Sequence, residues 1–276
     1  MKEAPLTLQP GGSALVLDSP HSGTLYPADF DYACELALLR RAEDTHVEKL
    51  FDFAPLLDVT LLQAHFPRSY LDANRAVDEI DQELLCEPWD APVNPSPKTR
   101  LGKGLAWRLT DEGVPIYRRR LRPSELRHRI DHCWRPYHAT LAQALDDAHA
   151  RHGYCVHLNC HSMPSVAASH ATEFPGEVHP DFVVGDRDGS TADPTLSAWL
   201  VDFLARRGWH VTHNHPYKGV ELVRRSGDPA HGRHSIQLEI NRRLYMDEET
   251  LELNEGYPAL KELLCEMAGG LLKVMA

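Results

Sequence analysis

The chain has 276 residues, 42% of them hydrophobic, which is enough to bury the core of one large α/β domain. Its formal net charge of −11 argues against broad nucleic-acid binding, because that function needs an extended basic surface. The sequence has no apolar run of about 18 residues and no apolar signal core near its start, so neither a membrane span nor secretion is predicted.

Segments of apolar periodicity alternate between strand and helix along the chain. In chain order we expect a strand over 14–17, a helix over 34–53, a strand over 59–62, a helix over 123–151, strands over 155–158 and 182–184, a helix over 194–206, strands over 210–212 and 235–239, and a helix over 258–274. This alternation predicts an α/β fold with helices on both faces of a central sheet. No linker is evident, so we expect a single domain over residues 1–276.

Residues 85–115 contain five prolines and read as a long loop. Long loops in compact domains are often functional. A lid over a binding site is the favoured interpretation of this segment, and a disordered excursion is the alternative.

The six cysteines are scattered and include no Cys-x-x-Cys pair, which predicts a reduced, cytoplasmic protein with free thiols. The seventeen histidines are many for this length. Most of them, including His138, His157 and His170, are expected to be structural or solvated.

Polar clusters mark the ends of predicted strands. They are residues 19–23 (Ser-Pro-His-Ser-Gly), 70–75 (Tyr-Leu-Asp-Ala-Asn-Arg), 159–162 (Asn-Cys-His-Ser) and 237–242 (Gln-Leu-Glu-Ile-Asn-Arg). Ligands of open α/β sheets bind at the carboxyl ends of strands, so these clusters could converge. Their imidazole, carboxylate and guanidinium groups are those of a metal-assisted hydrolase that acts on a carboxylate substrate.

The same clusters resemble a known family, the N-formylglutamate amidohydrolases (N-formylglutamate deformylases), which are similar in fold to zinc carboxypeptidases. The runs that carry the resemblance are 19–23, 44–47 (Asp-Thr-His-Val), 72–75, 159–162, 214–219 (Asn-His-Pro-Tyr-Lys-Gly) and 237–248. The resemblance implies a single α/β domain with a mixed sheet of the zinc-carboxypeptidase (phosphorylase/hydrolase-like) type. It also implies zinc-dependent hydrolysis of N-formyl-L-glutamate to formate and L-glutamate, the last step of one histidine-degradation route.

One Zn²⁺ per chain is implied, held by His21, His161 and a carboxylate. Zinc carboxypeptidases take their first histidine and a glutamate from a His-x-x-Glu motif, but here a threonine stands three residues after His21. Asp44, in a matching run, is the chosen carboxylate, with Glu43 and His46 as rivals. Such a site leaves a position for water, whose pKa zinc lowers to about 7.

The resemblance also implies roles for five other residues. Glu239 is expected to be the general base. The substrate is a dianion and needs cationic partners. The candidates for binding it are Asn74, Arg75, Arg242 and Lys218. For each of these residues the alternative is a purely structural role, for example in a surface ion pair or in a turn.

Two other functions stay open at this point. One is hydrolysis of another N-acyl amino acid or of a small carboxypeptidase-type substrate. The other is a metal-free binding protein that kept the fold. Asp72 is expected to orient its loop rather than to catalyse.

Overall fold

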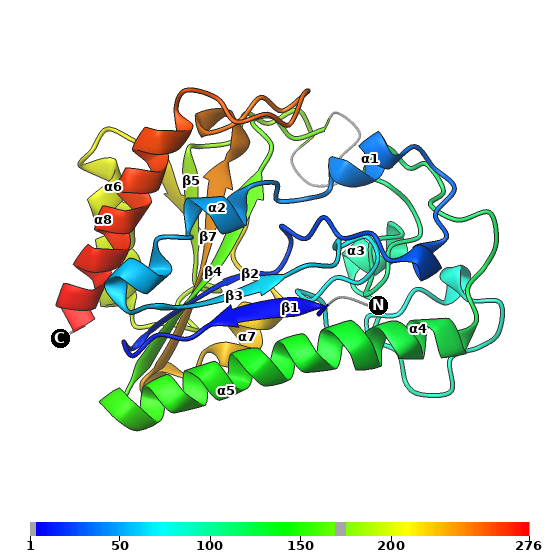
Figure 1. The fold of residues 1–276 in the computed structure, drawn as a ribbon, viewed down its shortest axis with the longest axis horizontal. Coiled ribbons are helices and arrows are strands. Elements are labelled where there is room, and N and C mark those ends of the chain that lie inside the picture. The colour runs from blue at the N-terminus through cyan, green and yellow to red at the C-terminus, as the bar shows by residue number, and fades with distance from the viewer. Residues whose placement is uncertain (1–3, 169–174, 276) are drawn as a thin grey trace. The chain divides into compact units, whose positions relative to one another are not determined.

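The computed structural model describes residues 4–168 and 175–275, and Figure 1 shows how their strands and helices are connected. The strands are β1 (Leu6–Gln9), β2 (Leu15–Ser19), β3 (Thr60–Ala64), β4 (Cys155–Met163), β5 (Phe182–Gly185), β6 (Val211–His213) and β7 (Arg233–Asn241). The α-helices are α1 (Leu36–Arg40), α2 (Val47–Leu50), α3 (Pro97–Arg100), α4 (Pro123–Arg129), α5 (Arg135–His152), α6 (Pro194–Ala205), α7 (Glu221–Ser226) and α8 (Tyr257–Met275).

Shorter helical turns link these elements. The 3₁₀ turns are Ala28–Phe30, Ala54–Leu57, Gln82–Leu84, Pro229–His231 and Arg242–Leu244, and a π-helical turn, Ile130–Trp134, joins α4 to α5. Within residues 4–168 and 175–275, no helix is long and apolar enough to cross a membrane. All six cysteines are free thiols, as predicted.

The described strands form one seven-stranded sheet in the order β1-β3-β2-β4-β7-β5-β6. Strand β4 pairs in parallel with β2 and with β7, whereas β5 runs antiparallel to β7 and parallel to β6. The sheet is therefore mixed, and the predicted α/β class with a mixed central sheet is confirmed. All nine residues of β4 are buried, as expected for a central strand covered on both faces.

One face of the sheet carries the main apolar core. Alternate residues of β4 and β7, such as Leu158 and Leu238, belong to one buried cluster with α2, α6 and α8. Burying each such side chain contributes roughly 1.5–3 kcal/mol. Helix α7 contacts β4 and β7, and its buried Leu222 and Val223 lie outside that cluster. Helices therefore cover both faces, as predicted.

The opposite face of the same strands is polar and still buried. By the two-residue alternation of a strand, Asp18, His157, Asn159, Gln237 and Glu239 point to this face. None of them is more than 8% exposed. Buried polar side chains are stable only when they are hydrogen-bonded, so this face must hold connected polar networks.

By internal contacts the chain divides into two compact units. Unit 1 comprises Met1–Thr7, Pro20–Asp44 and Gln63–Leu141. Unit 2 comprises Leu8–Ser19, Thr45–Leu62 and Ala142–Ala276. A single domain over residues 1–276 stays a prediction.

The core of unit 1 contains a buried guanidinium. Arg129 is 1% exposed, and its Cζ atom lies 4.1 Å from the ring centroid of Tyr70. Its Nη1 donates to the Tyr117 hydroxyl at 2.7 Å and to the Tyr70 carbonyl at 3.1 Å. Burying a charge is costly, and these ring and hydrogen-bond contacts offset part of that cost.

Residues 34–53 do not form the single helix that was predicted. The structure has α1 and α2 there, and the residue before α2, His46, has a φ of 67°. A left-handed residue other than glycine costs energy and interrupts a right-handed helix. The single-helix prediction is therefore wrong, and Asp44 lies in the turn between the two helices.

Strands β4 and β7 are four residues or more longer than predicted, and three short elements were missed. The predicted strand 155–158 continues as β4 to Met163, so Asn159 and His161 lie within the strand rather than after it. Strand β7 likewise runs on to Asn241. The short β1, α3 and α7 were not predicted.

The proline-rich segment 85–115 belongs to unit 1 and contains α3. Ser96 caps this helix by accepting from the Thr99 backbone at 3.2 Å. The Asn94 backbone donates to the Asp78 carbonyl at 2.8 Å. The segment follows a defined path, and its role as a lid stays a prediction.

Candidate active site

His21 lies in a tight turn that requires a glycine. A Cβ added at Gly23 would lie 2.3 Å from the Phe66 carbonyl oxygen and 2.4 Å from the His65 carbonyl carbon. Only glycine permits so close an approach of two backbone segments. Two residues further on, the Leu25 backbone donates to the His65 carbonyl at 2.9 Å. The Ser-Pro-His-Ser-Gly run is thus held against residues 65–66, and His21 is 1% exposed.

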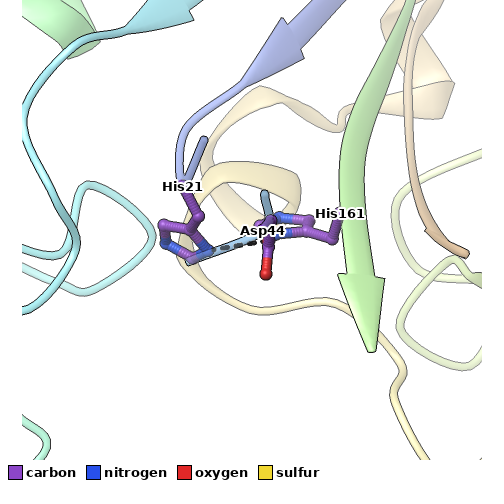
Figure 2. Close-up of side chains that lie close together, drawn as sticks. All are labelled: His21, Asp44 and His161. Carbon is purple, nitrogen blue, oxygen red and sulfur yellow. Dashed lines mark ion pairs between the residues drawn. The ribbon is translucent and has the colours of Figure 1, made fainter. Parts of the chain in front are cut away.

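Two carboxylates of unit 1 face the two ring nitrogens of His21. Its Nε2 lies 2.7 Å from Oδ1 of Asp72, and its Nδ1 lies 3.4 Å from Oδ2 of Asp44, the ion pair dashed in Figure 2. All three side chains are at most 2% exposed. Because a carboxylate only accepts, Asp72 fixes the hydrogen of His21 on Nε2 and makes Nδ1 the lone-pair nitrogen of the neutral ring.

Arg68 offsets the charge of these carboxylates. Its Nη2 donates to Oδ2 of Asp72 at 3.1 Å, and its Nη1 lies 3.9 Å from Oδ1 of Asp44. Burial alone would raise the pKa of Asp72, but the facing His21 and Arg68 hold that pKa well below its ordinary value. Arg68 was not among the predicted residues. Its position four residues before Asp72 in the sequence was the available signal.

Side chains of α4, α5 and the turn between them hold the loop 70–75 by its carbonyls. Arg129 donates to the carbonyl of Tyr70, Trp134 Nε1 to that of Arg75 at 2.9 Å, and His138 Nε2 lies 2.8 Å from that of Ala73. The Asp72 side chain in turn accepts from the Asn74 backbone at 2.9 Å. The loop-orienting role expected of Asp72 is observed, together with its contact to His21.

Asn74 and Arg75 are both buried, at 2% and 7% exposed. The Arg75 guanidinium donates to the Asn74 carbonyl at 3.2 Å and to the Lys103 carbonyl at 3.4 Å, and its Nε lies 3.9 Å from Glu79. A partly buried guanidinium at a rigid loop suits the binding of a carboxylate. Its role in substrate binding stays a prediction.

In unit 2, strand register places His161 beside Glu239. The two residues are Cα partners in the parallel pair of β4 and β7, and both point to the polar face. His161 is 3% exposed and Glu239 8% exposed. Gln237 Nε2 donates to Oε1 of Glu239 at 2.8 Å, which orients that carboxylate. The register alone therefore brings together an imidazole and a carboxylate of the predicted site.

His161 also contacts its neighbour on the same strand face. Its Nε2 lies 2.7 Å from Oδ1 of Asn159, which is completely buried. Asn159 belongs to a run that carried the family resemblance, but no role was assigned to it from the sequence. Several histidines of unit 2 were expected to be structural or solvated. Among them, His157 is buried and hydrogen-bonded, and His170 lies outside the described residues.

Two further predicted residues belong to unit 2. Arg242 Nε donates to the Ser162 hydroxyl at 3.1 Å, and Arg242 is 9% exposed. The Lys218 side chain is 57% exposed, and its Nζ lies 2.7 Å from Asp188. The segment around Lys218 packs on Gly185, where a Cβ would lie 2.8 Å from the Lys218 carbonyl carbon. Substrate binding by Arg242 and Lys218 stays a prediction.

The rivals for the carboxylate position have other contacts. Glu43 accepts from the Tyr26 hydroxyl at 2.5 Å, and His46 Nε2 lies 2.9 Å from the Leu251 carbonyl. The candidate metal ligands are His21 and Asp44, which face each other in unit 1 (Figure 2), and His161 of unit 2. The donor set of two imidazoles and one carboxylate matches that of catalytic zinc sites.

Comparisons with known proteins identify the family to which the chain belongs. The family model described as N-formylglutamate amidohydrolase matches residues 13–246. The N-formylglutamate deformylases of Pseudomonas aeruginosa and Pseudomonas putida are each 32% identical, and each alignment covers 88% of this chain and 86% or 85% of the relative. The crystal structure of N-formylglutamate amidohydrolase from Ralstonia eutropha JMP134 is similar at 44% identity and a TM-score of 0.90, covering 99% of this chain and 98% of that one. The chain belongs to the N-formylglutamate amidohydrolase family.

Proposed function

We propose that this protein is a zinc-dependent amidohydrolase that cleaves N-formyl-L-glutamate to formate and L-glutamate, as the last step of a histidine-degradation route. Membership of the amidohydrolase family supports the amide-bond chemistry. The two Pseudomonas relatives named N-formylglutamate deformylase support the substrate.

One observation carries the metal dependence. Asp72 accepts from Nε2 of His21, so in the neutral ring Nδ1 of His21 is an acceptor that faces a second acceptor, Oδ2 of Asp44, at 3.4 Å. Two acceptors in this arrangement are what a shared cation joins. We propose that His21, Asp44 and His161 hold one Zn²⁺. When bound, zinc supplies Lewis-acid activation of a water molecule and of the formyl carbonyl.

The protein's own groups move the protons. Glu239 takes a proton from the attacking water and delivers it to the nitrogen of the leaving amine. The hydrogen bond from Gln237 holds the Glu239 carboxylate in one orientation for this task. The oxygen of the water forms a bond to the formyl carbon, the bond between that carbon and the nitrogen breaks, and formate and L-glutamate leave.

Cationic side chains bind the two carboxylates of the substrate. A chain with a net charge of −11 repels a dianion, so its site needs local positive charge. Arg75 and Arg242 supply guanidinium groups that suit carboxylates, Asn74 supplies a neutral donor, and Lys218 supplies an ammonium group.

We propose further that the two units act as one domain in the cytoplasm. The matched range of 13–246 runs through segments of both units, which supports one domain. Six free thiols support a reducing compartment. In this proposal, segment 85–115 serves as a lid.

The test is a turnover screen of N-acyl-L-glutamates, from formyl through acetyl to succinyl, with and without a chelator. We expect the highest kcat/KM for the formyl substrate, loss of turnover with the chelator, and recovery when zinc is added. A higher kcat/KM for acetyl or succinyl would instead identify a hydrolase of another N-acyl amino acid. No turnover together with no bound metal would indicate a binding protein.

A further inference from the structure

A chain of buried hydrogen bonds leads away from His161 on the polar face of the sheet. His161 Nε2 lies 2.7 Å from Asn159 Oδ1, and Asn159 Nδ2 lies 2.7 Å from Asp18 Oδ1. The same oxygen of Asp18 lies 2.8 Å from His157 Nε2. Asp18, Asn159 and His157 are 0% exposed. These contacts join β2 and β4, two paired strands of unit 2.

The carboxylate of Asp18 sets the direction of each hydrogen bond between Asp18, Asn159 and His161. A carboxylate oxygen only accepts, so the Asn159 atom that faces Asp18 must be the amide nitrogen. The amide oxygen of Asn159 then faces His161 and also only accepts. Nε2 of His161 must therefore carry the hydrogen, which makes Nδ1 the lone-pair nitrogen of the neutral ring.

We propose that Asn159 and Asp18 are positioning residues that hold His161 in the Nε2–H tautomer and so present Nδ1 to the metal. The metal part of this inference rests on the proposed function, whereas the tautomer does not. His21 reaches the same tautomer through a carboxylate, Asp72, at 2.7 Å. His161 reaches it through a neutral amide whose own partner is a carboxylate. Both imidazoles thus offer the same nitrogen, and the partner of Nε2 is a carboxylate for His21 and a neutral amide for His161.

The rest of the network holds Asp18 in place. His157 also lies 2.8 Å, through Nδ1, from the Ser235 hydroxyl, so Ser235, His157 and Asp18 form a serine–histidine–carboxylate array. All three residues are 0% exposed. No substrate can reach a hydroxyl at this depth, so the array is not a hydrolytic site. It supplies Asp18 with a second donor and fixes its orientation.

The first test is the tautomer of His161 in the metal-free wild-type protein. Nitrogen-15 NMR above the pH range in which histidines titrate distinguishes Nε2–H from Nδ1–H, and a His161→Gln spectrum identifies the signals of His161 by their absence. We expect the Nε2–H form to dominate. A dominant Nδ1–H form would overturn the proposal, whether or not any variant folds.

The second test measures zinc dissociation by chelator competition in variants of the network. Asn159→Leu and Asp18→Leu remove the acceptor at each step. We expect each to weaken zinc binding roughly 10–100-fold and to give a mixture of His161 tautomers. Asp18→Asn keeps an acceptor oxygen at the same place, and we expect it to retain both the tautomer and most of the affinity.

Ser235→Ala is the matched control, because it alters the buried network without touching the Asp18–Asn159–His161 steps. We expect the wild-type tautomer and zinc affinity in this variant. Wild-type tautomer and affinity in Asn159→Leu would overturn the proposal. A wild-type protein that binds no zinc would count against the proposed function, and the tautomer measurement would still decide the role of Asn159.

Discussion

Nε2 of His21 donates to Oδ1 of Asp72 across 2.7 Å, and neither side chain is more than 1% exposed. A carboxylate behind a metal-binding imidazole orients the ring and raises its basicity as a ligand. Arg68 keeps that carboxylate ionised from the other side. We therefore expect the zinc affinity of the proposed site to depend on the Asp72–His21 contact.

Asp72→Asn tests this dependence. The amide keeps the size of the side chain but removes the charge behind His21, so we expect the zinc dissociation constant to rise roughly 10–100-fold. Asp81→Asn is the control, because Asp81 is a similarly buried acid of unit 1 that pairs with Arg108 at 2.7 Å. Equal zinc affinities for the two variants, measured by chelator competition, would remove Asp72 from the role of ligand support.

Glu239→Gln tests the general base. The glutamine matches the shape of Glu239 but cannot accept the proton, so we expect kcat to fall roughly 10²–10⁴-fold while zinc content and melting temperature are retained. Glu221→Gln changes another buried glutamate of unit 2, which pairs with Arg224 at 2.8 Å. That control should keep wild-type turnover. Turnover of wild-type size in Glu239→Gln would show that another group moves the proton.

Arg75→Gln tests carboxylate binding. A charged hydrogen bond contributes about 1.5–3 kcal/mol, so KM for N-formyl-L-glutamate should rise roughly 10–100-fold. KM for N-formyl-L-glutamine, whose side chain is neutral, should rise less. Arg108→Gln, which alters an arginine paired with Asp81, should change neither constant. The same rise in KM for both substrates would argue against a contact between Arg75 and the substrate's side-chain carboxylate.

Gly23→Ala tests the turn that carries His21. The new methyl group would overlap the backbone of residues 65–66, so we expect a loss of about 1–3 kcal/mol in the free energy of unfolding, together with weaker zinc binding. Gly269→Ala is the matched control within α8, because a Cβ there meets no atom within 4 Å. It should stabilise the protein by about 0.5–1 kcal/mol. Denaturant unfolding of both variants checks the two signs, and an unchanged Gly23→Ala would contradict the tight turn.

The fold class was accessible from the sequence because apolar periodicity carries it. Strands such as β2 and β5 and helices such as α6 and α8 lie where their patterns predict. The helix 34–53 was predicted wrongly because apolar periodicity does not show the left-handed backbone of His46, which interrupts the helix. The prediction of β4 ended too early because the alternating polar residues Asn159 and His161 are typical of a loop. In the structure they are buried within the strand and hydrogen-bonded to each other.

The predicted site residues were identified from the polar clusters at strand ends and from the sequence runs that resemble the family. Such patterns indicate positions in the chain but not contacts. Arg68 lies outside those runs, and only the folded loop shows that it faces both Asp72 and Asp44. Asp18 and Asn159 are 141 residues apart in the chain, and their hydrogen bond depends on the pairing of β2 with β4. Contacts of this kind require the fold.

The content of bound zinc, measured by elemental analysis of purified wild-type protein and of His161→Ala, tests the central claim most directly. Three protein ligands at one site predict about one zinc per wild-type chain and a large loss in His161→Ala. The absence of zinc from wild-type protein produced with zinc present would contradict the account, and so would full retention of zinc by His161→Ala.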